Sequence, residues 1–162
     1  MKTKNCSFES GFTLIELLVV IAIIGVLATL LLANLNATRT RARDAERKSD
    51  LKNIQTALRL YYNDNDQAFP FAGAGNQIKA CSSGGNSNCT WGQAWTADDR
   101  TYMNTLPADP SDDRDYYYEY VDDDNYILST CLENTSDDLC NPVNSHPQCA
   151  GSLNGCTYLV KP

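Results

Sequence analysis

The sequence predicts an α+β protein in which a long N-terminal α-helix packs on a small antiparallel β-sheet with disulfide-stapled loops. Three observations support this fold class. A proline-free stretch runs from Phe12 to Phe69 and opens with an apolar run. The rest of the 162-residue chain is rich in Asn, Asp, Gly, Ser and Tyr. Six of the 7 cysteines lie in this polar remainder.

The chain divides into three predicted parts: a polar leader at 1–11, a helix at 12–62 and a globular head at 63–162. Within the helix, residues 12–33 form an apolar segment about 33 Å long at about 1.5 Å per residue. A bilayer core is about 30 Å thick, so this segment is long enough to span a membrane. No small-residue cleavage site follows it, and we therefore expect it to stay in the mature protein.

The second half of the predicted helix is amphipathic. Leu51, Ile54, Leu58 and Tyr61 recur at spacings of three and four, with polar residues on the other faces. The head is the only part of the chain against which this apolar face can pack. The helix is expected to end in the Asn/Asp cluster before Pro70.

The head carries the predicted sheet of three or four strands. Residues 116–130 contain two β-prone runs separated by a polar turn at 122–125, which is typical of a hairpin. Residues 156–160 form a further strand candidate. Residues 71–105 are predicted to be irregular, with a short helix around 91–103.

The cysteine pattern predicts disulfides. Cys6 lies in the leader and is the odd one out, which leaves six in the head: Cys81, Cys89, Cys131, Cys140, Cys149 and Cys156. Such a count is typical of a small exported domain. A zinc site is the alternative, although the chain has no CxxC pair and a single histidine, His146.

Sequence spacing suggests one of the bridges. Cys81 and Cys89 flank a short flexible loop and are expected to pair locally. The last four cysteines could pair in sequence order, or nest as Cys131 with Cys156 and Cys140 with Cys149. Six cysteines allow 15 connectivities, and spacing alone does not select one.

Glu16 is the one charged residue of the apolar run. A carboxylate at a bilayer centre costs about 2.5–3.5 kcal/mol on insertion scales, and such residues are usually functional. Nothing within the run is expected to pair with it, so its partner is expected to come from elsewhere. A tolerated interfacial glutamate in a simple membrane anchor is the alternative.

The stretch "GFTLIELLVVIAIIGVLA", which begins at Gly11, resembles the N-terminal signature of type IV pilins and type II secretion pseudopilins. The resemblance covers about the first 30 residues, and the order of long helix, small sheet and late cysteines extends it. It implies the pilin fold. It also implies cleavage by a prepilin peptidase between Gly11 and Phe12, followed by methylation of the Phe12 amine.

The resemblance further implies a filament subunit, a homo-oligomer assembled through its N-terminal helices. Glu16 would meet the N-terminal amine of a neighbouring subunit there. A membrane-embedded assembly platform is an implied partner. Before assembly the subunit would cross the inner or cytoplasmic membrane once, with its head outside, and it would then join a cell-surface filament.

Two weaker patterns remain open. The basic cluster Arg39, Arg41, Arg43, Arg47 and Lys48 predicts ion pairs with Asp44, Glu46 and Asp50 or with a neighbouring subunit, or else a solvated face. Two Asp-rich stretches could supply oxygen ligands for calcium, or could be hydrophilic loops. The calcium candidates are Asp109, Asp112, Asp113, Asp122 and Asp124.

Composition limits the function classes. With 13 Lys+Arg against 20 Asp+Glu, the net charge of −7 does not indicate DNA as a partner. No GxSxG, Gly-rich phosphate loop or HExxH occurs, so no catalytic residue is assigned and the chain is not expected to be an enzyme. The alternatives are a pseudopilin of a secretion or DNA-uptake machine and, more remotely, a membrane-anchored exported enzyme.

Overall fold

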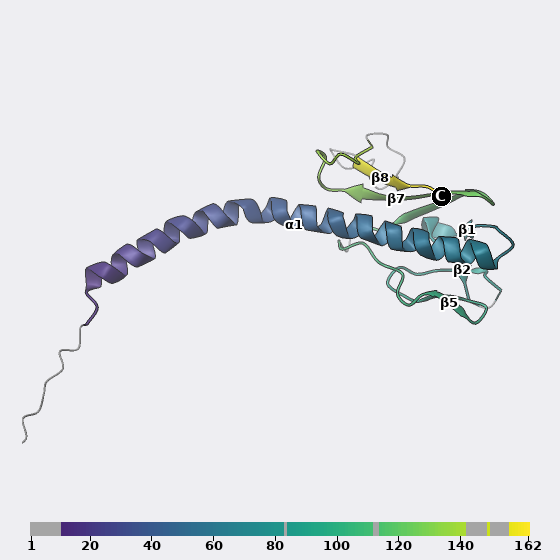
Figure 1. Cartoon of the computed structure of the whole chain (residues 1–162), viewed down its shortest axis with the longest axis horizontal. Helices are drawn as coiled ribbons and strands as arrows, with labels where there is room; N and C mark the ends of the chain where they lie inside the picture. The colour runs from purple at the N-terminus through teal and green to yellow at the C-terminus, as the bar shows by residue number, and fades with distance from the viewer. Residues whose placement is uncertain (1–10, 83, 112–113, 142–148, 150–155) are drawn as a thin grey trace, which may run out of the picture. The chain divides into compact units, whose positions relative to one another are not determined.

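The computed structural model describes residues 11–82, 84–111, 114–141, 149 and 156–162, without the side chains of residues 30–34. Two compact units make up the chain, Met1–Arg39 and Thr40–Pro162. Helix α1 (Leu14–Asp64) contributes to both, and the strands belong to the second unit (Figure 1). The remaining elements are β1 (Phe71–Ala72), the 3-10 helix η1 (Ala74–Asn76), β2 (Ile78–Cys81), β3 (Ser87–Asn88), β4 (Trp95–Ala97), β5 (Arg100–Met103), β6 (Tyr117–Asp122), β7 (Asn125–Leu132) and β8 (Cys156–Val160).

Helix α1 begins and ends within two residues of the predicted range 12–62. Its end follows from backbone conformation. Asp66 and Gln67 both adopt positive φ, at 51° and 58°, which is a left-handed geometry that stops a helix. The Gln67 N–H donates to the Tyr62 carbonyl at 3.1 Å and thereby satisfies one of the last helical acceptors. The predicted leader, apart from Gly11, lies outside the described residues.

The apolar face of α1 in the second unit packs into the core, as its spacing predicts, and Tyr61 at its end is partly buried against that core. Leu51, Ile54 and Leu58 are 0% exposed and belong to one core cluster with Trp95 and Leu128. Burying a Leu or Ile side chain contributes about 1.5–3 kcal/mol. This stripe is therefore the main attachment of the helix to the head.

The strands form three small antiparallel sheets, β1-β2-β3, β4-β5 and β6-β7-β8, in place of the single sheet expected. The prediction for residues 71–105 is wrong in detail, because β1 to β5 lie there and no helix occupies 91–103. Asp98 and Asp99, both at positive φ, close the β4–β5 hairpin. An Asp-Asp pair is a weaker signal of such a turn than Asn-Gly, which explains the error.

The predicted hairpin and terminal strand are confirmed. β6 and β7 pair around Asp122 and Asn125, and β8 pairs with β7 from Leu128↔Val160 to Leu132↔Cys156. Alternate residues of β7 point towards the helix, and among them Tyr126 and Leu128 are buried in the core. The Tyr118 hydroxyl donates to the Pro70 carbonyl at 2.6 Å, which ties β6 to the segment after α1.

Three disulfides are present, with pairings Cys81–Cys89, Cys131–Cys149 and Cys140–Cys156. The first is the local bridge that the sequence suggests. The other two are interleaved, so neither pairing proposed for the last four cysteines is correct.

Strand register explains the interleaving. Cys131 lies opposite Thr157, and Cys156 lies opposite Leu132. Neighbouring positions on a strand point to opposite faces of the sheet, so Cys131 and Cys156 face away from each other. Cys156 belongs to the core cluster on the helix side and is met by Cys140, whereas Cys131 is met by Cys149 on the other face. A nested Cys131–Cys156 bridge would need a one-residue slip of β8.

The Cys140–Cys156 bridge also places the next residue beside the free edge of β8. Asn141 forms an antiparallel bridge with Thr157 through two backbone hydrogen bonds of 2.9 and 3.1 Å. β8 is thus covered on the side away from β7 at this position.

The connectivity can be tested with single cysteine variants. In Cys131→Ser, the freed thiol is expected at Cys149, because the other two bridges stay intact. Alkylation of the unfolded, unreduced mature chain followed by fragment mass analysis locates the label. A label at Cys156 would indicate nested pairing, and one at Cys140 would indicate pairing in sequence order. The Cys131→Ser/Cys149→Ser double variant should unfold with about 2–4 kcal/mol less stability than the parent.

Candidate functional site

The first unit contains the residues of the N-terminal signature. Thr13 precedes the first helical residue, and Glu16 lies three positions later in the first turn. The Thr13 N–H and hydroxyl donate to Glu16 Oε2 at 2.9 and 2.7 Å, and the Glu16 N–H donates to the Thr13 hydroxyl at 3.3 Å. This reciprocal arrangement is a capping box. The expectation that nothing in the run pairs with Glu16 is therefore wrong, because a polar neighbour three residues away does so.

The capping box uses only one carboxylate oxygen. Glu16 Oε1 takes no part in these bonds, and the charge of the carboxylate has no cation beside it within the described run. Glu16 thus lies along the first turn of α1, and its Oε1 atom can still accept a hydrogen bond from a further donor. Gly11 and Phe12 are exposed next to it, with Phe12 at 88%.

An apolar surface follows Glu16. From Phe12 to Leu27 the large hydrophobic side chains are all about half exposed or more. In the part of the chain whose side chains are described, no helix combines the length and apolar content of a membrane span. The span at 12–33 stays a prediction. An exposed apolar surface of this extent is typical of an interaction site.

A buried ion-pair network attaches the start of the second unit's helix to the head. Arg47 is 0% exposed, and its guanidinium donates to both oxygens of Asp109 at 2.8 Å each. It also donates to Asp44 at 2.9 Å, to Glu133 at 2.8 Å and to Ser111 at 2.8 Å. The planar fork of arginine suits such multiple bonding.

The surrounding groups complete the network, which we call the Arg47 network: Arg43, Asp44, Arg47, Asp109, Ser111 and Glu133. Asp44 also accepts the backbone N–H groups of Glu133 and Asn134 at 2.9 and 2.8 Å. Arg43 pairs with Glu133 in a two-bond contact. Three carboxylates are thereby matched by two guanidinium groups and by backbone donors, which satisfies the buried charges.

The basic cluster is thus largely paired within the chain. Arg43 and Arg47 belong to the network, and Lys48 pairs with Asp137. Of the predicted acidic partners, Asp44 is confirmed, whereas Asp50 accepts a hydrogen bond from the Tyr116 hydroxyl at 2.6 Å. Arg39 and Arg41 are exposed.

Sequence reasoning missed the partners from the head. Asp109, Glu133 and Asp137 lie 62 to 90 positions from the arginines and lysine that they bind. No local spacing rule links residues so far apart in the chain. One sequence feature does point to acidic partners in the head: basic residues gather on a helix that also carries an apolar face for packing on that head.

Hydrogen bonds from Arg43 and Arg47 lower the pKa of Glu133 from 4.5 to about 2, against the effect of its burial. The unfolded chain therefore binds a proton at Glu133 between about pH 4.5 and pH 2 that the folded chain does not. We expect the contribution of Glu133 to the free energy of unfolding to be complete above about pH 4.5 and to fall by on the order of 2 kcal/mol as the pH drops to about 2, with solvent screening of this partly exposed group taken into account.

Glu133→Gln should remove this part of the acid sensitivity. The measurement is denaturant unfolding of both chains between pH 2 and pH 6. Lys48 lowers the pKa of Asp137 as well, so some acid sensitivity remains in the variant. Parallel stability curves for Glu133→Gln and the parent would contradict the role assigned to Glu133.

The calcium candidates do not form a common site in the described residues. Both oxygens of Asp109 are bound to Arg47. Asp122 and Asp124 lie in the β6–β7 turn, where Asp122 accepts the Asp124 N–H and Asp124 accepts the Tyr62 hydroxyl. Asp112 and Asp113 lie outside the described residues. Among those described, no three His, Cys, Asp or Glu side chains are grouped to hold a metal.

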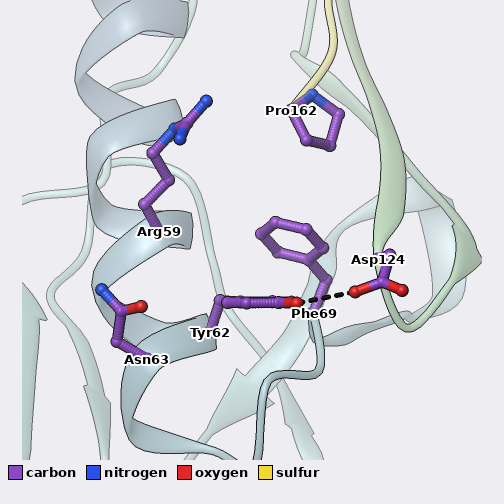
Figure 2. Close-up of a pocket in the computed structure, with 6 residues that line it drawn as sticks. All are labelled: Arg59, Tyr62, Asn63, Phe69, Asp124 and Pro162. Atoms are coloured by element: carbon purple, nitrogen blue, oxygen red, sulfur yellow. Dashed lines mark hydrogen bonds between the residues drawn. The ribbon is translucent and has the colours of Figure 1, made fainter.

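A pocket of about 310 Å³ lies between the last turns of α1 and the β6–β7 turn (Figure 2). Its lining consists of Arg59, Tyr62, Asn63, Phe69, Asp124 and Pro162. The rings of Tyr62 and Phe69 lie 4.6 Å apart, between the helix that carries Arg59 and the turn that carries Asp124. The Tyr62 hydroxyl donates to Asp124 at 2.6 Å, which holds the two walls together.

Comparison with known proteins identifies the family. Residues 6–32 match the family model of the prokaryotic N-terminal methylation motif. The type II secretion system core protein G of Pseudomonas aeruginosa is 35% identical over 102 residues, which are 63% of this chain and 68% of that protein. The chain belongs to the type IV pilin and pseudopilin family. The Klebsiella pneumoniae core protein G gives a similar match, 33% identical over 63% of this chain and 69% of that protein.

A pilin relative matches over a shorter region. The type IV major pilin protein PilA of Myxococcus xanthus is 38% identical over 76 residues, which cover 47% of this chain and 33% of that protein. No solved structure gives a significant match. The family model covers Gly11, Phe12 and Glu16, so the motif and the capping box coincide in this pilin-family chain.

Proposed function

We propose that this pilin-family chain is the structural subunit of a type IV pilus-like filament. A prepilin peptidase removes residues 1–11 and methylates Phe12, and the mature subunits assemble through their N-terminal helices. The match of residues 6–32 to the N-terminal methylation motif is the observation that carries the proposal. The exposed apolar side chains from Phe12 to Leu27 supply the surface that assembly would bury.

The proposal extends to partners and location. Before assembly, the subunit is held in the inner or cytoplasmic membrane by residues 12–33 with its head outside, next to a membrane-embedded assembly platform. Glu16 receives the Phe12 ammonium of an adjacent subunit, which relieves the cost of an unpaired carboxylate among apolar helices. The finished filament lies at the cell surface and acts as scaffold, not as an enzyme.

A pseudopilus of a type II secretion system is the second candidate. The relatives matched over about two thirds of their length are core G proteins of such systems. Deleting the gene in its host distinguishes the two: a pilus subunit is needed for surface filaments, and a pseudopilus subunit is needed for protein export.

Processing is the first test of either filament function. The intact mass of membrane-held or sheared protein should correspond to a chain that begins at methylated Phe12. This mature chain has a side-chain charge of −8, since removal of Lys2, Lys4 and Glu9 leaves 11 basic and 19 acidic residues. A mature chain that begins near Asn34 or Thr38 would show cleavage behind the apolar run and would overturn the proposal.

A further inference from the structure

The pocket on the second unit has the features of a receptor for an apolar side chain next to an acid. Its apolar wall is made by the rings of Tyr62 and Phe69 and by Pro162 (Figure 2). Arg59 is exposed at the helix side and forms no ion pair with any described residue. Asp124, the acidic group of the lining, is already bonded to Tyr62 on the opposite wall.

Further positive charge lies on the Arg59 side of the pocket. Lys52 is exposed on α1 seven positions before Arg59, which places both side chains on one face of the helix. Lys161, next to Pro162, is also exposed, and its carbonyl accepts a hydrogen bond from Gln55 of α1 at 2.8 Å. The carboxylate of the lining, Asp124, lies on the opposite wall (Figure 2). An acidic group can therefore approach from the Arg59 side without first meeting a like charge of the pocket.

A complementary segment is displayed elsewhere on the same head. Leu139 is 56% exposed and follows Asp138, which is exposed and forms no ion pair or hydrogen bond with a described residue. Two anchors hold this segment: Asp137 pairs with Lys48 on one side, and Cys140 is bonded to Cys156 on the other. Asp137 also accepts the Leu139 N–H at 3.0 Å. The Asp138–Leu139 pair is therefore tethered on both sides, which reduces the entropy lost on binding.

The segment cannot fill the pocket of its own chain. Its anchor on α1, Lys48, is 11 positions from Arg59, a distance of about 16 Å along the helix axis. The pocket and the Asp138–Leu139 segment are different surfaces that lie apart on one head. When two copies bind through them, one copy keeps a free pocket and the other keeps a free segment. Such heterologous contacts produce open-ended assemblies when the rotation does not close.

We propose that Leu139 of one copy docks in the Arg59 pocket of a second copy, with Asp138 of the first paired to Arg59 of the second. The contact joins heads, in addition to the N-terminal helices, and rests on the proposed function in a filament. Leu139 packs on Tyr62 and Phe69, and the Asp138 carboxylate accepts from the Arg59 guanidinium at the pocket rim. The ion pair selects the register, and the leucine contributes buried apolar area.

Charge reversal in the full-length chain tests the pairing. We expect Arg59→Glu and Asp138→Arg each to lower the yield of sheared filaments by about tenfold or more, because each places like charges in contact. The double variant should restore most of the yield, since the pair is re-formed with opposite polarity. This rescue also shows that both single variants fold. Lys52→Glu is the control on the same helix face, outside the pocket lining: it should lower the yield less than Arg59→Glu does, and Asp138→Arg should not rescue it.

The apolar part of the contact has its own pair of variants. Leu139→Ser should reduce the yield, whereas Leu60→Ser, at a residue of similar exposure on α1, should not. Normal filaments from Arg59→Glu and Asp138→Arg, or two single losses without rescue, would overturn the docking proposal and leave the filament function standing. A parent chain that is processed at Phe12 but never assembles would overturn both.

Discussion

Replacing Arg47 by methionine is expected to destabilise the head by about 3–5 kcal/mol. The methionine fills much of the same volume, but Asp44, Asp109 and Glu133 lose the cation that they share. Breaking a buried ion pair by removing one partner leaves uncompensated charge, which is the costly case. Denaturant unfolding of the oxidised chain in detergent measures the loss.

Arg41→Met is the matched control for this variant. Arg41 is exposed on the same helix, so its replacement should change the stability by less than about 0.5 kcal/mol. Arg47→Lys should lie between the two, since lysine keeps the charge but cannot donate to Asp109 with a planar fork. Equal stability of Arg47→Met and Arg41→Met would show that the network contributes little to holding α1 on the head.

Replacing Glu16 by alanine is expected to abolish filament assembly while leaving the processed subunit in the membrane. Removal of the carboxylate lowers the cost of holding the helix in lipid. An incoming Phe12 ammonium would then be buried without a counter-charge, at a cost of roughly 3–5 kcal/mol per contact. The measurement is the ratio of sheared filament to membrane-held subunit, with the mature N-terminus checked by mass.

The capping box makes glutamine the informative control at this position. Glu16→Ala removes both the charge and the cap, and loss of a cap alone costs about 0.5–2 kcal/mol. Glu16→Gln keeps an acceptor for the Thr13 donors and removes only the charge. We expect an intermediate yield for Glu16→Gln. Full assembly of both variants would show that the carboxylate is not an assembly determinant.

The elements that the sequence predicts well are those with strong local signals. The stripe Leu51, Ile54 and Leu58 and the β6–β7 hairpin depend on spacings within one element, and both occur as predicted. The short strands β1 to β5 lack such periodicity, because two to four residues are too few to show alternation. Their positions depend on contacts with the core.

The candidate sites divide in the same way. The residues of the N-terminal signature could be identified from sequence, since they lie within six positions of one another. The capping box has a local signal as well, because Thr13 stands three positions before Glu16. The Arg47 network and the disulfide interleaving depend on which residues the fold brings together and on which sheet face each one occupies. Neither is encoded in local spacing.

The backbone pairing of Asn141 with Thr157 limits how the head can pair with the strands of other chains. An uncovered strand edge offers unpaired N–H and C=O groups to any other chain, and crowded copies can then add strands to one another without limit. Here the Cys140–Cys156 bridge carries Asn141 to the outer side of β8, so the backbone groups of Thr157 are already occupied. A strand of another chain cannot pair with β8 at that point. The Cys140–Cys156 disulfide therefore protects against aggregation through this edge as well as stabilising the fold.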